Sequence, residues 1–125
     1  MLKRIYVDNY KSLVNFDLSV GQINLFLGPN GSGKSAVFEV LKKIQDFVGG
    51  VGKTDEIFSL DDRTRWQSSQ HQTFELDIEG SEGVYRYELS IELVEKWQKP
   101  RVNYERLWFN DRPLMKFGHR FKSPK

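Results

Sequence analysis

Eight residues, Gly28 to Ser35, constrain this chain more than any other stretch of its 125 residues. They read Gly-Pro-Asn-Gly-Ser-Gly-Lys-Ser and match the pattern G-x-x-x-x-G-K-S/T in full. Glycines let the backbone curl, so that the amide N–H groups of residues 31–35 can point into one hollow. A helix that begins near Ser35 would add unpaired N–H groups and the positive end of its dipole. The motif therefore predicts a cradle for a compact polyanion such as a triphosphate.

The segments on either side of this loop fit a strand–loop–helix unit. The run at 23–27, Ile-Asn-Leu-Phe-Leu, is typical of a strand that is covered on both faces in a parallel sheet. After the loop, apolar residues recur at helical spacing from Val37 to Val48, Glu39 belongs to the side expected to face solvent, and Gly49-Gly50 supplies a stop. A coincidental glycine-rich turn would require neither flank, so the context favours a working phosphate-binding loop.

Each part of this unit has an expected role in binding ATP and Mg²⁺. Lys34 is expected to reach the β- and γ-phosphates as a mobile positive charge. Ser35 is expected to offer its hydroxyl to Mg²⁺, a cation that keeps most of its waters and takes few protein ligands. Ser35 is therefore the predicted magnesium ligand, and the full set of predicted nucleotide contacts comprises Gly28, Asn30, Gly31, Ser32, Gly33, Lys34, Ser35 and Ala36.

Alternating apolar and polar residues predict antiparallel strands on both sides of the unit. The predicted strands are 3–7 and 16–20 before the loop, and 74–78, 85–93, 102–109 and 113–117 after it. A short helical turn is expected around 55–60. The expected organisation is one N-terminal part of a larger domain, with strands, loop and first helix over 1–50, a loop-rich connector over 51–72, an antiparallel β segment over 73–117 and a basic tail over 118–125.

Composition excludes several other classes of site. The chain has no cysteine, so it forms no disulfide, thiolate metal site or cysteine nucleophile. It has no signal-peptide core and no apolar stretch long enough to span a bilayer, so we expect a cytoplasmic location and no membrane partner. The net charge of +2 does not by itself imply nucleic acid. The basic C-terminal segment 96–125, in which only Glu105 and Asp111 are acidic, leaves contact with nucleic acid open.

The segment Asn9-Tyr10-Lys11-Ser12-Leu13, a second strand, the run at 23–27 and the glycine-rich loop together resemble the opening of SMC/RecF-like and related AAA-family ATPases, relatives of ABC ATPase heads. Further similarity to uncharacterised bacterial members extends through 62–66, 72–76, 85–89 and 104–107. The resemblance implies an α/β (α+β) fold in which a partial P-loop NTPase core adjoins an antiparallel β lobe. It also implies that Lys11 and Ser12 lie near the nucleotide and that a second ATPase head is a partner.

The catalytic elements of complete heads are not recognisable in this sequence. The segment 57–62 superficially resembles a Walker B strand, but it is short, contains Ser59 and follows the first helix too closely, so it favours a surface turn or helix end. We therefore expect a chain that binds ATP·Mg²⁺ without hydrolysing it alone, because phosphoryl transfer needs a positioned water and further positive charge. A single parallel strand and a single helix would leave the apolar face of Val37 to Val48 partly bare. Either the chain is a fragment of a longer ATPase, which we favour, or another copy or a partner covers this surface. In isolation we expect self-association.

Two other functions are open at this stage. A small P-loop kinase or GTPase is disfavoured, because a strand pair precedes the loop and the guanine-reading pattern Asn-Lys-x-Asp is absent. The alternative to an ATPase segment is a non-catalytic nucleotide-sensing or DNA-associated module in a repair or phage-defence complex. Salt-dependent DNA binding would separate the two, because contacts to phosphate weaken steeply with salt.

Overall fold

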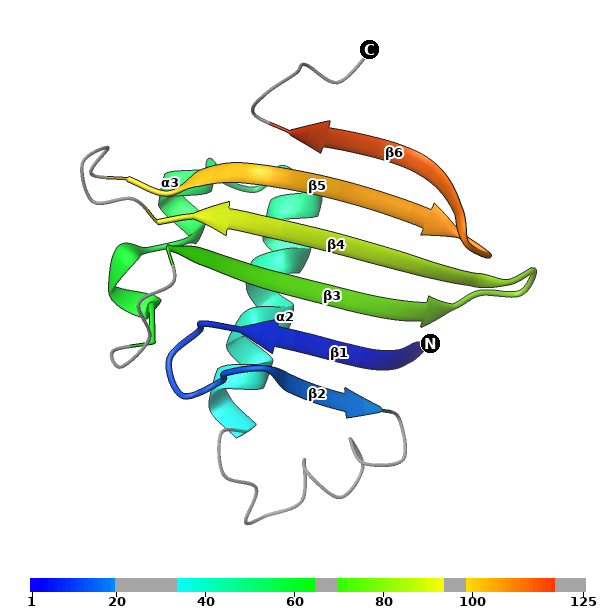
Figure 1. Cartoon of the computed structure of the whole chain (residues 1–125), viewed down its shortest axis with the longest axis horizontal. Helices are drawn as coiled ribbons and strands as arrows, with labels where there is room; N and C mark the ends of the chain where they lie inside the picture. Colours follow the sequence, from blue (N-terminus) through cyan, green and yellow to red (C-terminus); the bar gives the residue numbers. More distant parts are fainter. Residues whose placement is uncertain (20–33, 65–69, 94–98, 119–125) are drawn as a thin grey trace.

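The structure is a computed structural model that describes residues 1–19, 34–64, 70–93 and 99–118, and it is drawn in Figure 1. The predicted strand at 23–27 and the glycine-rich residues 28–33 lie outside these ranges. Among the described residues, no helix is long and apolar enough to cross a membrane.

An antiparallel sheet of six strands forms most of the described structure (Figure 1). Its order is β2-β1-β3-β4-β5-β6, and each neighbouring pair is antiparallel. The strands confirm the alternation found in the sequence, with apolar side chains on one face and polar side chains on the other. Their bounds are β1 Leu2–Asp8, β2 Phe16–Ser19, β3 His71–Glu79, β4 Val84–Glu92, β5 Arg101–Phe109 and β6 Arg112–Gly118.

The sheet joins two parts of the chain that the sequence had placed in separate regions. β1 pairs with β3, so that Ile5 lies opposite Leu76 and Val7 lies opposite Phe74. All four of these side chains are buried. The first strands and the later antiparallel segment therefore share one core, and the described part is a mostly antiparallel sheet with few helices, consistent with a fragment of an α/β ATPase.

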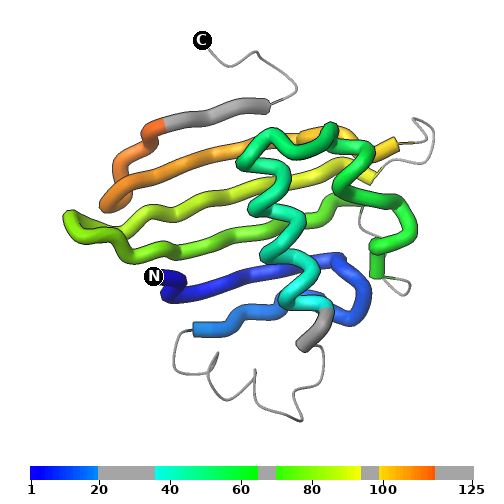
Figure 2. Tube along the Cα trace, turned by 180° about the vertical axis from the view of Figure 1, so that it is seen from behind, coloured from blue at the N-terminus to red at the C-terminus, as the bar shows by residue number. Residues whose placement is uncertain are grey.

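One long helix, α2 (Lys34–Val48), crosses a single face of this sheet (Figures 1 and 2). Val37, Val40 and Ile44 recur at helical spacing and are buried, and Val40 has no exposed surface. The expectation that this apolar face would be partly bare is wrong for these residues, because the sheet covers them. It holds at the end of the helix, where Val48 is 61% exposed.

The connector between α2 and β3 contains two short helices, α3 (Thr54–Ile57) and the 3₁₀-helix η1 (Leu60–Asp62). Phe58, between them, is buried, and its ring lies 5.9 Å from that of Phe47 and 5.7 Å from that of Phe74. This contact anchors the connector to both the helix and the sheet. The acidic residues at its end, Asp61 and Asp62, lie in the 3₁₀-helix, in line with the expected surface turn or helix end, whereas Phe58 before them is buried.

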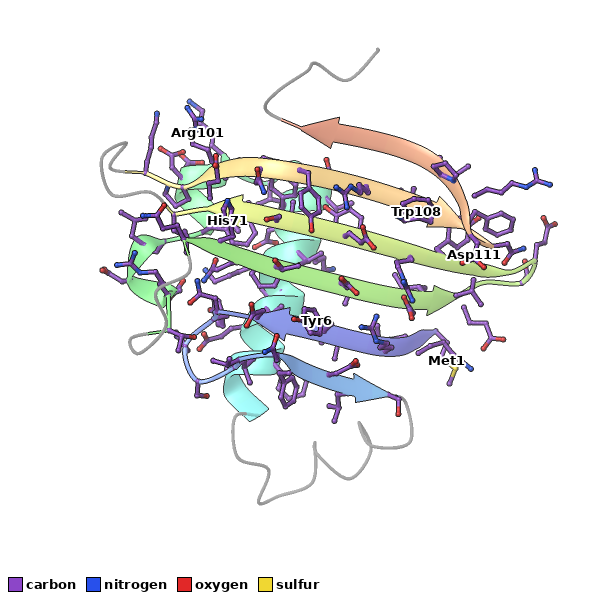
Figure 3. All side chains as sticks on the ribbon, viewed as in Figure 1. Met1, Tyr6, His71, Arg101, Trp108 and Asp111 are labelled. Atoms are coloured by element: carbon purple, nitrogen blue, oxygen red, sulfur yellow. The ribbon has the colours of Figure 1, made fainter. Side chains whose placement is uncertain are left out.

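The face of the sheet turned away from α2 is polar, and Figure 3 shows Tyr6 and Trp108 on it. Arg4 Nε lies 2.9 Å from Asp17 Oδ1, and Arg4 Nη1 lies 3.2 Å from Glu75 Oε1. Such cross-strand pairs stabilise the sheet and balance the charge of this face.

Candidate functional site

The structure describes the predicted phosphate-binding unit only from its helix onward. The predicted helix start is confirmed, because α2 begins at Lys34, directly after the glycine-rich loop. Ala36, the last predicted contact, is buried. For Lys34 and Ser35 the structure describes the helical backbone. The predicted contacts outside the described residues are Gly28, Asn30, Gly31, Ser32 and Gly33.

The N-terminal half of α2 is held firmly at the edge of the sheet formed by β1 and β2. Figures 1 and 2 show the helix beginning beside these two strands and running toward β5. Ala36, Val37 and Val40 are all buried there. The first turn of a helix carries unpaired N–H groups, so its placement fixes where those donors lie.

The polar turn that follows β1 packs against this same half of α2. Tyr10 and Leu13 are buried and form an isolated antiparallel bridge, with Leu13 N donating to Tyr10 O at 2.8 Å. Asn9 and Lys11 have φ values of +65° and +51°, in the left-handed region that few residues other than glycine adopt. The turn is therefore tight, and its backbone conformation requires stabilising contacts with other parts of the chain.

A buried network around Asn9 supplies that support. Asn9 Oδ1 accepts a hydrogen bond of 2.9 Å from the backbone N–H of Thr64, and Asn9 Nδ2 donates one of 2.9 Å to the carbonyl of His71. The Asn9 carbonyl accepts a third, of 3.0 Å, from Gln72 Nε2. Asn9, Thr64 and Gln72 are fully buried. Sequence reasoning missed this network, because its members lie 55 and 63 positions apart and no local pattern relates them.

Lys11, predicted by resemblance to lie near the nucleotide, contacts α2 through Glu39. Its Nζ lies 2.7 Å from Glu39 Oε1, and the Tyr10 hydroxyl donates to the same oxygen at 2.9 Å. The hydrogen bonds from Lys11 and then Tyr10 lower the pKa of Glu39 below its ordinary value. The bond to Glu39 raises the pKa of Lys11, and burial raises that of Tyr10. Glu39, which the sequence assigned to the solvent side, is therefore held in an ion pair and a hydrogen bond. Ser12, the other residue of the turn that was predicted to lie near the nucleotide, is exposed.

A hollow of mixed charge surrounds this contact. Its lining includes three lysines and four carboxylates, drawn from the turn after β1, from α2 and from the connector. They are Lys11, Lys42, Lys43, Glu39, Asp46, Glu56 and Asp62. Within the part of the chain that the structure describes, no group of three or more acidic, histidine or cysteine side chains is placed to hold a metal ion.

Comparison with known proteins identifies the family. Residues 1–107 match the family described as the AAA ATPase domain. A stretch of 41 residues is 39% identical to the OLD nuclease of Thermus scotoductus; it covers 33% of this chain and spans 8% of that protein's length. No solved structure shows a significant match. Because the family match takes in the glycine-rich loop, α2 and the strands from β1 to β4, this chain belongs to the AAA ATPase domain family.

Proposed function

We propose that this chain binds ATP·Mg²⁺ as the N-terminal segment of an ABC/SMC/RecF-like ATPase head. The observation that carries the proposal is the start of α2 at Lys34, the lysine of the G-x-x-x-x-G-K-S pattern. A helix that starts at this residue presents free N–H groups and a positive dipole to the loop before it. Membership of the AAA ATPase domain family supports nucleotide as the ligand.

The residues of the loop have distinct proposed roles. Backbone N–H groups of residues 31–35 would surround the phosphates, and Lys34 would add a mobile positive charge at the β- and γ-phosphates. Ser35 would place its hydroxyl on Mg²⁺. Lys11 and Ser12 belong to the turn that packs on α2, which supports their proposed place near the nucleotide.

Hydrolysis is proposed to need groups from elsewhere in a complete head and from a second head. Asp61 and Asp62, the residues that superficially resemble a Walker B pair, lie in the 3₁₀-helix η1. Asp62 Oδ2 lies 3.6 Å from Lys43 Nζ, and Asp62 Oδ1 lies 3.9 Å from Lys11 Nζ. These contacts support a structural role for Asp62, so we expect no steady turnover by this chain alone.

An apolar groove beside α2 supports the proposal that this segment works within a larger assembly. It is lined by Leu41, Phe47 and Val48 of the helix and by Ile78 and Leu107 of the sheet. A surface of this kind usually has a partner. In the isolated chain we expect self-association, which sedimentation at increasing protein concentration would detect as a rising mean mass.

The test is the affinity for ATP with and without Mg²⁺, measured by calorimetry beside two lysine variants of α2. Lys34→Ala should abolish detectable binding, because the phosphates lose their charged partner. Lys42→Ala is the matched control, because Lys42 is an exposed lysine that pairs with Asp46 at 3.0 Å farther along the same helix. Equal affinity of wild type and Lys34→Ala would refute the proposed function.

A DNA-associated module is the second candidate. The name of the Thermus scotoductus relative states a nuclease, and β5 and β6 carry Arg101, Arg106 and Arg112. Two of these arginines lie near carboxylates: Arg106 Nη1 is 3.4 Å from Glu88 Oε1, and Arg101 Nη2 is 3.8 Å from Glu92 Oε1. This pairing reduces the positive charge offered to DNA. Binding of a duplex that weakens steeply between low and moderate salt would favour this function.

A further inference from the structure

We propose that Lys11 serves the nucleotide site as the fixed counterion of Glu39, cancelling a carboxylate that would otherwise repel the phosphates. This inference rests on the proposed ATP site at the start of α2. It assigns to Glu39 and Lys11 a joint electrostatic role, in place of a direct contact between Lys11 and a phosphate.

The position of Glu39 creates the need for such a counterion. Glu39 follows Ser35 by four residues within α2, so the two positions share one side of the helix and lie about 6 Å apart along its axis. A negative charge is favourable in the first turn of a helix, and this benefit fades beyond that turn. A bare carboxylate at this position would therefore act mainly by repelling a triphosphate at the end of the helix.

The contacts of Glu39 supply the compensation. Lys11 Nζ lies 2.7 Å from Glu39 Oε1, and the hydroxyl of the buried Tyr10 donates to the same oxygen at 2.9 Å. Both contacts are short, but Lys11 and Glu39 are partly exposed, so solvent reduces the attraction between their charges. The ion pair thus offsets the negative charge of Glu39, and Lys43 on the same helix also contributes to this offset.

The backbone of Lys11 is held in place for this contact. Its N–H donates to the carbonyl of Asp62 at 2.6 Å, and its own carbonyl accepts from Thr64 Oγ1 at 2.7 Å. The two neighbouring lysines of the hollow are engaged with other acceptors: Lys42 pairs with Asp46, and Lys43 donates to the carbonyl of Ile57. Lys11 Nζ also lies 3.9 Å from Asp62 Oδ1, so Glu39 is the nearer of its two carboxylate partners.

A double-mutant cycle tests the inference on the complete 125-residue chain. Mg·ATP affinity is measured by calorimetry for wild type, Lys11→Met, Glu39→Gln and the double variant, with Lys34→Ala and Lys42→Met alongside. Lys11→Met should weaken binding roughly three- to tenfold at low salt, as expected for one uncompensated charge at this range. The double variant should return to within about twofold of wild type, since it removes both charges. Glu39→Gln alone should bind no more weakly than wild type, and Lys42→Met should bind as wild type does.

The other outcomes overturn the inference. Weak binding by both Lys11→Met and the double variant would show that Lys11 contacts phosphate directly, and wild-type affinity of Lys11→Met would show that the pair has no electrostatic role. In both cases a loss of binding in Lys34→Ala leaves the proposed function standing. Wild-type affinity of Lys34→Ala would remove the proposed function and this inference with it. If circular dichroism shows that Lys11→Met is unfolded, Lys11→Gln takes its place in the cycle with the same expectations.

Discussion

At the scale of single residues, Asn9 combines a buried side chain with a backbone of positive φ. Its side chain makes two hydrogen bonds inside the core, and its φ of +65° suits asparagine better than alanine. We predict that Asn9→Ala lowers the free energy of unfolding by about 2–4 kcal/mol, because buried partners lose their bonds and the backbone is strained. Denaturant titration followed by circular dichroism measures this change.

Asn15 is the matched control for Asn9. It also has a positive φ, of +46°, but it is exposed, and its side chain accepts a bond from the Tyr6 hydroxyl at the surface. Asn15→Ala should cost about 1 kcal/mol, since water can replace the lost partner. If both variants lost the same free energy of unfolding, the buried hydrogen bonds of Asn9 would not be the source of the loss.

Glu39 gives a second prediction at this scale, in the pH dependence of stability. Bonds from Lys11 and Tyr10 lower its pKa in the folded chain, so its contribution is present above the pKa of an unfolded glutamate and is lost as the pH falls through the folded value. The titratable groups that face Glu39 in the hollow are Lys11, Tyr10, Asp62 and Lys43. Both members of the Lys11–Glu39 pair are partly exposed, so the effect is small, below about 1 kcal/mol.

The measurement is the free energy of unfolding of wild type and Glu39→Gln between neutral pH and pH 3. Wild type should be slightly more stable than Glu39→Gln at neutral pH. This difference should disappear as the pH falls below about 4, because Glu39 then becomes protonated in the folded chain as well. An advantage that grows on acidification would have the wrong sign for an ion pair of this kind.

The sequence predicted part of this residue-scale picture. The glycine-rich motif placed the start of α2, and helical spacing marked an apolar face from Val37 to Val48. Val37, Val40 and Ile44 of this set are buried, whereas Val48 is exposed. The same spacing assigned Glu39 to the solvent side, because periodicity describes one helix and carries no information on which loop will cover it. Lys11 was predicted to lie near the nucleotide only from a family resemblance. Its contact with Glu39 could not be predicted, because it forms only when the fold packs the turn after β1 against the helix.

At the scale of elements, two turns at one end of the sheet are interlocked. Asn110 and Asp111 join β5 to β6 with φ values of +47° and +68°, as a two-residue hairpin turn requires. Asn110 also binds the start of β4: its N–H donates to the Val84 carbonyl, and its Oδ1 accepts from the Val84 N–H, both at 2.9 Å. The two strands predicted at 102–109 and 113–117 imply a short connection here, whereas its contact with the β3–β4 turn was not foreseeable.

Gly83 makes this contact possible, and a pair of glycine variants tests it. A Cβ on Gly83 would lie 2.5 Å from Asn110 Oδ1, whereas a Cβ on Gly80 in the same turn would meet Tyr85 at an ordinary 3.4 Å. We predict that Gly83→Ala costs about 1 kcal/mol, because the Asn110 side chain must release Val84. Gly80→Ala should be close to neutral. Thermal unfolding compares the two, and similar melting temperatures would contradict the predicted contact.

At the scale of the whole molecule, the order of the strands in the sheet could not be predicted from the sequence. Alternation identified the buried faces of β1, β2, β3 and β4, because a period of two follows from the backbone itself. It does not reveal which strands are neighbours. β1 pairs with β3 across more than half of the chain, and this pairing places α2 on a surface made by strands from both halves. The parallel strand predicted at 23–27 lies outside the described residues and stays a prediction.

This arrangement gives a final prediction about ligand and fold. The helix that is proposed to hold phosphate at its first turn also packs against the central strands, so nucleotide bound there should stabilise the fold as a whole. A ligand at about 100 times its Kd adds about 2.7 kcal/mol to the free energy of unfolding. For a domain of this size, that corresponds to a rise in melting temperature of roughly 10 °C. Mg·ATP should produce this rise in wild type and in Lys42→Ala, and none in Lys34→Ala. A rise of the same size in all three proteins would place the nucleotide at a site other than the start of α2.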